Sequence, residues 1–399
     1  MISTDGVLIT LALIILIGYV GDYLFRLTRV PEAVILMLIG VLLVPIGHVI
    51  PVKYVTLLRD LAPLFGDIAL VMIMFDGGRR ISFRTPISSS GLGLALATLD
   101  VAIPSVLLAV VMYSFFNWPL VYGAILGAIL GETTTTVIVP LATRLVINDE
   151  TYNTIVIEAT FNSVVSILFF YLLTILLTGH FSILSYTRYV ISYFSIAVFL
   201  GLIAGMLWLL ALNWIRSTKA YVVTIGIAFL LYGIVDLLGG AAVVAVLIFA
   251  VIIGNHEVIS EYMGLRLNIS EERLNIVESE LEFLVRTFFY VLIGMISIIS
   301  LYYALLALVV TGVLLAIRYI EIFSVVRDSK ASNLLFALAP RGLTAAVLAS
   351  IFLNMNYQPY SSYIFLVTFM VIIFTNIVSS GLLSIMVKAS VKSEEQKVE

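Results

Sequence analysis

An acid, four consecutive threonines and a proline interrupt one apolar segment at residues 127–140. Glu132 opens this polar run and Thr133–Thr136 follow it. Threonine is a mediocre helix former, because its branched side chain restricts its rotamers and its hydroxyl competes for backbone hydrogen bonds. Pro140 has no N–H, so the carbonyl of Thr136 loses its helical partner. The segment is therefore predicted to be an interrupted helix that gathers a carboxylate, hydroxyls and free carbonyl oxygens.

These groups have the chemistry to bind a cation. Ionisable side chains within membrane segments are rare and usually functional, and broken helices near the middle of a membrane are typical of ion sites in transporters. A carboxyl group deprived of water favours its neutral form, so it can give up a proton for a cation and later recover the proton. The alternative is a kinked helix in which Glu132 lies on the surface.

A second polar group lies on the next apolar segment. Glu158, Asn162 and Ser166 are four residues apart and so share one face of a helix. We predict a cation- and proton-binding site made of Glu132, Thr133, Thr134, Glu158, Asn162 and Ser163. Within it, Na⁺ or K⁺ would contact Glu132, Thr133, Asn162 and Ser163. Alternatively, the Asn162 amide joins two helices, a role that is compatible with a site.

Two deep arginines need partners. A charged side chain at the centre of a membrane helix costs roughly 2.5–3.5 kcal/mol on insertion scales, so Arg318 and Arg341 should be paired. Glu158 is the predicted partner of Arg341 in a structural ion pair, with Arg318 as its competitor, and Glu321 lies one turn after Arg318. If Glu158 and Arg341 neutralise each other, Glu132 is the uncompensated carboxylate. Asp100 is interpreted as a structural residue or part of a proton route.

The composition indicates a membrane protein throughout. The chain is 62% hydrophobic and 11% charged, whereas a soluble domain is roughly 45–50% apolar and 25% charged. It has no cysteine, which excludes disulfides and thiolate chemistry. Nucleotide-binding and metalloprotease motifs are also missing, and nothing points to nucleic acid. The prediction is a transporter without cofactors rather than an enzyme.

Apolar segments cut at charges and turns give about thirteen transmembrane helices, since one span needs about 20 apolar residues. They are predicted at 5–26, 31–50, 57–79, 87–116, 119–146, 150–178, 187–215, 218–237, 240–254, 281–299, 301–326, 331–354 and 360–389. They form one transmembrane domain, 1–389, with an acidic cytoplasmic connector at 256–280 and a short cytoplasmic tail at 390–399. Lysine and arginine concentrate on one side, which predicts a multi-pass cell-membrane protein with its N-terminus outside and its C-terminus in the cytoplasm.

Two predicted spans are broken at corresponding positions. Pro140 follows the threonine run, and Pro340 interrupts the twelfth predicted span and frees the carbonyl of Phe336. Interrupted helices in corresponding places of two halves are the best sequence indication of a transporter site. The spacing between them fits two repeats of opposite topology.

An ordered series of motifs resembles the monovalent cation/proton antiporter superfamily, most closely its first group of prokaryotic sodium/proton exchangers, the NhaP-like proteins. The series covers nearly the whole chain: Val30-Pro-Glu32, Leu38-Ile-Gly40, Phe75-Asp-Gly-Gly78, the segment from Glu282 to Gly294, and Ala339-Pro-Arg-Gly342. The resemblance implies an all-α fold of the NhaA type, with thirteen helices, inverted repeats and two unwound crossing helices. It also implies a homodimer and alternating access.

The resemblance extends to single site residues, with two departures. Glu158, Asn162, Arg341 and Thr133 match residues of the family, in which the Glu–Arg pair is structural. The family's Asn-Asp pair, whose Asp carries the ion, is Asn162-Ser163 here. Its Thr-Asp-Pro at the crossing is Thr133-Thr134-Thr135, beside the additional Glu132.

The leading hypothesis is an electroneutral exchange of Na⁺ or K⁺ for H⁺ at Glu132. The loss of the family's aspartates together with the gain of a glutamate motivates it. A channel-like or ion- and pH-sensing protein on an antiporter scaffold is the alternative. Transport of an organic anion is a third hypothesis, against which a glutamate at each candidate site argues.

Overall fold

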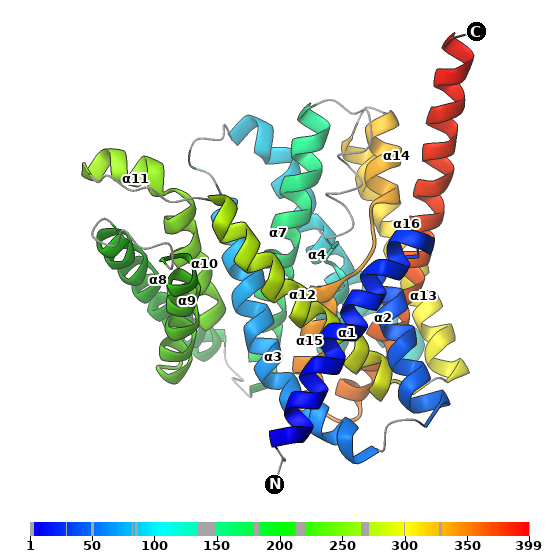
Figure 1. Cartoon of the computed structure of the whole chain (residues 1–399), viewed down its shortest axis with the longest axis horizontal. Helices are drawn as coiled ribbons and strands as arrows, with labels where there is room; N and C mark the ends of the chain where they lie inside the picture. Colours follow the sequence, from blue (N-terminus) through cyan, green and yellow to red (C-terminus); the bar gives the residue numbers. More distant parts are fainter. Residues whose placement is uncertain are drawn as a thin grey trace. The chain divides into compact units, whose positions relative to one another are not determined.

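The chain folds into helices alone within the residues that the computed structural model describes, which are 4–28, 30–48, 52–81, 83, 87–134, 149–178, 183–212, 220–264, 271–298, 300–326 and 329–398 (Figure 1). The α-helices are α1 (Thr4–Thr28), α2 (Glu32–Val41), α3 (Val52–Arg79), α4 (Ile87–Phe116), α5 (Leu120–Leu130), α7 (Asp149–Ile175), α8 (Ile183–Leu212), α9 (Ala220–Leu237), α10 (Ala242–Gly254), α11 (His256–Met263), α12 (Glu271–Ile296), α13 (Leu301–Val325), α14 (Ser329–Ala337), α15 (Leu343–Asn354) and α16 (Tyr360–Val398). A π-helical turn, η1 (Leu42–Ile46), follows α2, and a 3₁₀ turn, η2 (Leu176–Thr178), follows α7.

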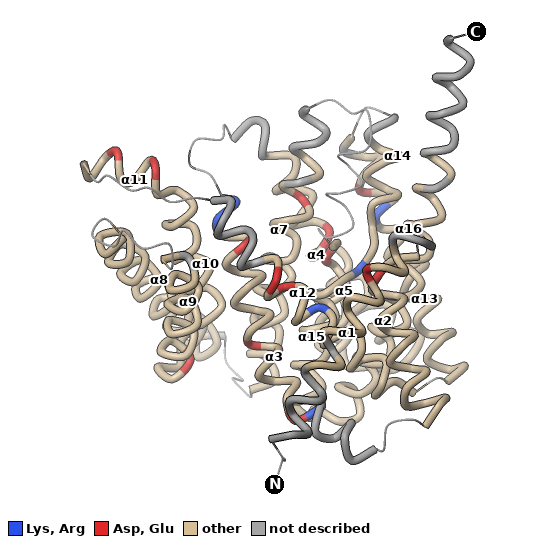
Figure 2. The backbone as a smooth tube through the Cα atoms, in the orientation of Figure 1, with Lys and Arg blue, Asp and Glu red and all other residues tan. Residues whose placement is uncertain are grey.

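Six of the described helices are long and apolar enough to cross a membrane, or seven if the bent pair α10–α11 is one span. Further apolar helices are shorter, among them α5 and α15, which flank the predicted breaks. Charged residues are sparse along the helices (Figure 2). The described residues thus confirm an all-helical membrane protein.

Several predicted boundaries agree closely with the helices. The segment predicted at 87–116 is α4, and that predicted at 301–326 is α13. The predicted connector contains α11 and the first turns of α12, which continues into the tenth predicted span. Helix α16 continues through the predicted tail to Val398.

The chain divides into two compact units. The first comprises residues 1–65, 87–170 and 286–399, and the second comprises 66–86 and 171–285. Within the second unit, α10 packs against α8 and α9. Its Asn255, at the bend between α10 and α11, accepts a hydrogen bond from the Phe83 N–H (2.7 Å) and donates one to the Ile81 carbonyl (2.6 Å). This amide fixes the bend to the segment that follows α3.

Within the first unit, close packing of α5 on α4 positions the candidate site. Gly123 and Gly127 on α5, and Gly131 directly after it, recur every four residues, and each lies against the backbone of α4. A Cβ atom on Gly131 would lie 2.7 Å from the carbonyl oxygen of Asp100. Small residues at this spacing let two membrane helices approach closely. The stripe therefore brings the end of α5, and Glu132 just after it, next to Asp100.

Candidate functional site

Two non-helical segments next to helix ends meet inside the first unit. Helix α5 ends at Leu130 and residues 131–134 are not helical, while residues 338–342 separate α14 from α15. The Thr134 N–H donates to the Pro340 carbonyl (3.0 Å), and Gly342 lies directly against the Thr134 side chain. The two predicted breaks therefore contact one another. The rest of the threonine run and Pro140 lie outside the described residues.

Glu132 is buried at the N-terminus of α15. Its side chain is 1% exposed, and Oε1 accepts hydrogen bonds from the N–H groups of Gly342 (2.8 Å) and Ala345 (3.3 Å). The first N–H groups of a helix have no partner within it, and the helix dipole favours negative charge at this end. One carboxylate oxygen is thus held by backbone donors. The surface-facing alternative for Glu132 is wrong.

The second oxygen of Glu132 faces a neutral hydroxyl group. Oε2 lies 3.4 Å from the Ser163 hydroxyl, which donates to it. Thr133 and Asn162 are fully buried, and neither Thr133 Oγ1 nor Asn162 Oδ1 has a hydrogen-bond partner among the described residues. Buried polar atoms are nearly always hydrogen-bonded, so such exceptions call for a specific explanation. A bound cation would supply the missing partner.

Arg341 binds the backbone that precedes the site. Its Nη1 donates to the carbonyls of Gly131 (2.9 Å) and Glu132, at the end of α5. Its own carbonyl accepts from Asn376 Nδ2 (2.8 Å) on α16. A guanidinium at the C-terminus of a helix satisfies free carbonyls and complements the dipole. Among the described residues, Arg341 forms no ion pair with the Glu132 carboxyl group.

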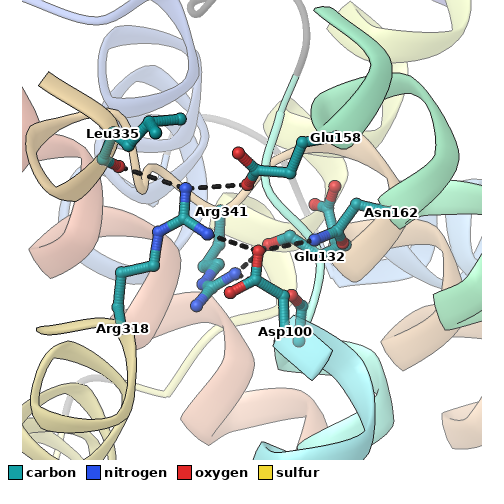
Figure 3. A network of polar contacts seen from close by, with 8 residues as sticks. Asp100, Glu132, Glu158, Asn162, Arg318, Leu335 and Arg341 are labelled. Atoms are coloured by element: carbon teal, nitrogen blue, oxygen red, sulfur yellow. Dashed lines mark hydrogen bonds and ion pairs between the residues drawn. The ribbon is translucent and has the colours of Figure 1, made fainter. Parts of the chain in front are cut away.

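The buried ion pairs centre on Arg318 (Figure 3). Its Nη2 contacts Glu158 Oε1 (2.7 Å) and donates to the Leu335 carbonyl (3.1 Å), while Nη1 bonds Asp100 Oδ2. The prediction that Glu158 pairs with Arg341 is therefore wrong. Glu158 forms its ion pair with Arg318, the predicted competitor, whereas Arg341 donates to backbone carbonyls. No ion pair joins Glu321 to Arg318 among the described residues.

Asn162 and its neighbour Ser163 connect these ion pairs with Glu132. The Asn162 Nδ2 donates to Asp100 Oδ2 (3.2 Å; Figure 3). The hydroxyl of Ser163 donates to Glu132. Ser166 donates to the Ala128 carbonyl (2.7 Å) and so fixes α7 to α5. The polar face of α7 therefore points inward, as predicted. The Asn162 amide also joins two helices, α7 and α4.

Sequence reasoning missed two contributions to the site. Asp100 bonds both Arg318 and Asn162, whereas the sequence left its role open. The backbone N–H groups of Gly342 and Ala345 hold Glu132. A buried acid in mid-span was the available signal for Asp100. Every residue except proline has a backbone N–H group, so the residue types could not identify these two as donors.

Fold and site together define a multi-pass membrane protein of the ion-transporter class, in which two non-helical segments meet at a buried carboxylate. A family model for the transmembrane sodium/hydrogen exchanger matches residues 11–389. The chain therefore belongs to the sodium/hydrogen exchanger family, whose members are transporters rather than enzymes.

Individual relatives are distant. The structure of the sodium proton antiporter MjNhaP1 from Methanocaldococcus jannaschii superposes with a TM-score of 0.78, at 20% sequence identity, over 94% of this chain and 97% of that one. The K(+)/H(+) antiporter NhaP2 of Shewanella sp. (strain ANA-3) is 27% identical over 202 residues. That match covers 49% of this chain and 35% of NhaP2, about a third of its length.

Proposed function

We propose that this protein exchanges a monovalent cation, Na⁺ or K⁺, for H⁺, with Glu132 as the carboxyl group that carries one or the other. One observation supports this most directly. Glu132 is buried with one oxygen held by backbone N–H groups, and the other faces a hydroxyl, with unpartnered oxygens on the adjoining residues. Family membership supports the class of reaction.

The proposed cation ligands are one carboxylate oxygen and three neutral oxygens. They are Glu132 Oε2, Thr133 Oγ1, Asn162 Oδ1 and Ser163 Oγ, with Thr134 beside them. Oxygen ligands suit hard ions such as Na⁺ and K⁺. Glu158, bound to Arg318, belongs to the scaffold rather than to the ligand set. The lone exchangeable charge favours a one-for-one, electroneutral cycle.

Alternating access would open this site to each side in turn. We place it in a fold of about thirteen helices in inverted repeats, the arrangement in which such sites lie near the midplane. The proposal includes a homodimer in the cell membrane, an outside N-terminus and a cytoplasmic C-terminus. The charge bias and the family resemblance support these points.

Both ions remain candidates. The superposed structure is titled a sodium proton antiporter, and the Shewanella relative is named a K(+)/H(+) antiporter. Vesicles carrying the purified protein and a pH-sensitive dye should show proton movement when Na⁺ or K⁺ is added, without dependence on membrane potential. Comparing Na⁺, K⁺ and Li⁺ across pH would identify the ion. Equal dye signals with and without the protein would refute exchange.

A channel-like or ion- and pH-sensing function is the second candidate. Ser163 stands where the family has its ion-carrying aspartate, which leaves one acid fewer for coupling. In the same vesicles, cation uptake without any counter-movement of protons would favour this alternative over exchange.

A further inference from the structure

Two adjacent side chains of α16 hold the non-helical segment before α15. Thr375 Oγ1 accepts a hydrogen bond from the Arg341 N–H (3.2 Å), and Asn376 Nδ2 donates one to the Arg341 carbonyl (2.8 Å). Both side chains are buried. They are also fixed to their own helix, because Thr375 donates to the Val371 carbonyl (2.8 Å) and Asn376 to the Ile372 carbonyl (2.8 Å). Thr375 and Asn376, which we call the α16 clamp, therefore bind both backbone polar groups of Arg341.

One peptide group connects Asn376 with the Glu132 carboxyl group. Its carbonyl belongs to Arg341 and accepts from Asn376, and its N–H belongs to Gly342 and donates to Glu132 Oε1 (2.8 Å). The carbonyl and the N–H of a trans peptide group point in opposite directions within one plane. A donor that holds the carbonyl therefore fixes the direction of the N–H. Polarisation along such a chain of hydrogen bonds also strengthens the bond to the carboxyl group.

The preceding peptide group is held in the same way. Its N–H belongs to Arg341 and donates to Thr375, and its carbonyl belongs to Pro340 and accepts from the Thr134 N–H (3.0 Å). Each of the two consecutive peptide groups thus joins one residue of the α16 clamp to one residue after α5. The clamp therefore sets the position of the backbone that carries the Gly342 N–H.

We propose that Thr375 and Asn376 are positioning residues for the exchange site, and that Asn376 acts on Glu132 through the peptide group that lies between them. This role rests on the proposed exchange at Glu132. A hydrogen bond donated to a carboxyl oxygen favours the ionised form, which binds a cation, over the protonated form. By holding the Gly342 N–H in place, Asn376 therefore favours the cation in its competition with H⁺.

The variant Asn376→Leu tests this role, because leucine has a similar volume and lacks the donor. In vesicles, the Na⁺ or K⁺ concentration that gives half-maximal flux should rise about fivefold at mildly acidic pH, the effect of weakening one hydrogen bond. At alkaline pH few protons compete for the site, so this concentration should be close to the wild-type value. The maximal flux should also stay close to that of the wild type.

Two further isosteric variants complete the comparison. Thr368→Val removes another buried hydroxyl from α16, one without a hydrogen-bond partner among the described residues, and should change neither the flux nor the half-maximal concentration. Thr375→Val removes the acceptor of the preceding peptide group. It should shift the half-maximal concentration in the same direction as Asn376→Leu but by less, and it provides the same test if Asn376→Leu does not fold.

All three variants leave the charge of the site unchanged. Among the described residues of the first unit, the buried charged side chains besides Glu132 are Asp100 on α4, Glu158 on α7, Arg318 and Glu321 on α13, and Arg341 before α15. A changed pH dependence therefore reports on the hydrogen bonds of Glu132 rather than on a lost charge.

Hydrogen–deuterium exchange tests the α16 clamp without transport. The backbone N–H groups of the fragment that contains Gly342 and Ala345 should exchange faster in Asn376→Leu than in the wild type or in Thr368→Val. Unchanged hydrogen exchange would overturn the proposal. A shift of the half-maximal concentration by the same factor at both pH values would overturn it as well, because an asparagine that only joins two helices would give that result. A wild-type protein without cation exchange would refute the proposed function, and hydrogen exchange alone would then decide whether Asn376 holds this backbone.

Discussion

Replacing Glu132 with glutamine should abolish cation-driven proton flux and leave the protein folded. Glutamine retains an oxygen that can accept from the N–H groups of Gly342 and Ala345, so the N-terminus of α15 keeps its cap. It cannot bind or release a proton near neutral pH, and it offers a cation no charge. The dye signal of Glu132→Gln vesicles should therefore equal that of protein-free vesicles.

Two matched variants sharpen this experiment. Glu132→Asp keeps the charge but shortens the side chain by one methylene, so it should retain part of the flux at a weaker apparent cation affinity. Glu280→Gln makes the same chemical change at an exposed position of α12 and should be silent. Wild-type flux in Glu132→Gln would show that another group carries the ion.

Replacing Arg318 with methionine should destabilise the protein more than any other single loss of a described ion pair. The change leaves Asp100 and Glu158, each 2% exposed, without their cationic partner. Breaking a buried pair on one side costs about 3–5 kcal/mol, because an uncompensated charge stays buried. A large drop in the thermal unfolding midpoint in detergent, with poor yield, is the expected result.

The control for this change lies in the same unit. Arg286 contacts Glu32 (3.3 Å) with both side chains partly exposed, so Arg286→Met should have a clearly smaller effect. Adding Asp100→Asn and Glu158→Gln to Arg318→Met neutralises the stranded acids and should recover part of the stability. An unfolding midpoint like the wild-type one for Arg318→Met, or no recovery in the triple variant, would contradict the pairing described above.

Much of the helical architecture follows from the sequence. Membrane helices are set by runs of apolar residues that end at charges and turns, so segments such as 87–116 and 301–326 are recognisable without tertiary information. The breaks are also local, because Pro340 and the polar run after Gly131 remove or compete for helical hydrogen bonds. That the two breaks contact each other was suggested only by their corresponding positions.

The partners of the buried charges are not local. Arg318 and Arg341 are both deep, and which of them reaches Glu158 depends on the rotation and packing of α7, α13 and the segment before α15. Asp100 enters the site because the glycine stripe of α5 permits close contact with α4. The predicted residues Glu132, Asn162 and Ser163 do lie in one region, through contacts of α7 with α4 and with the segment after α5 that spacing along the chain could not fix.

Exchange at Glu132 is tested most directly by whether cation binding displaces a proton from this residue. Purified protein in weakly buffered detergent, with a pH indicator, can be titrated with Na⁺ and K⁺ near neutral pH. The wild-type protein should release one proton for each cation bound, and Glu132→Gln should release none. Cation binding without proton release, or the same release from Glu132→Gln, would contradict it.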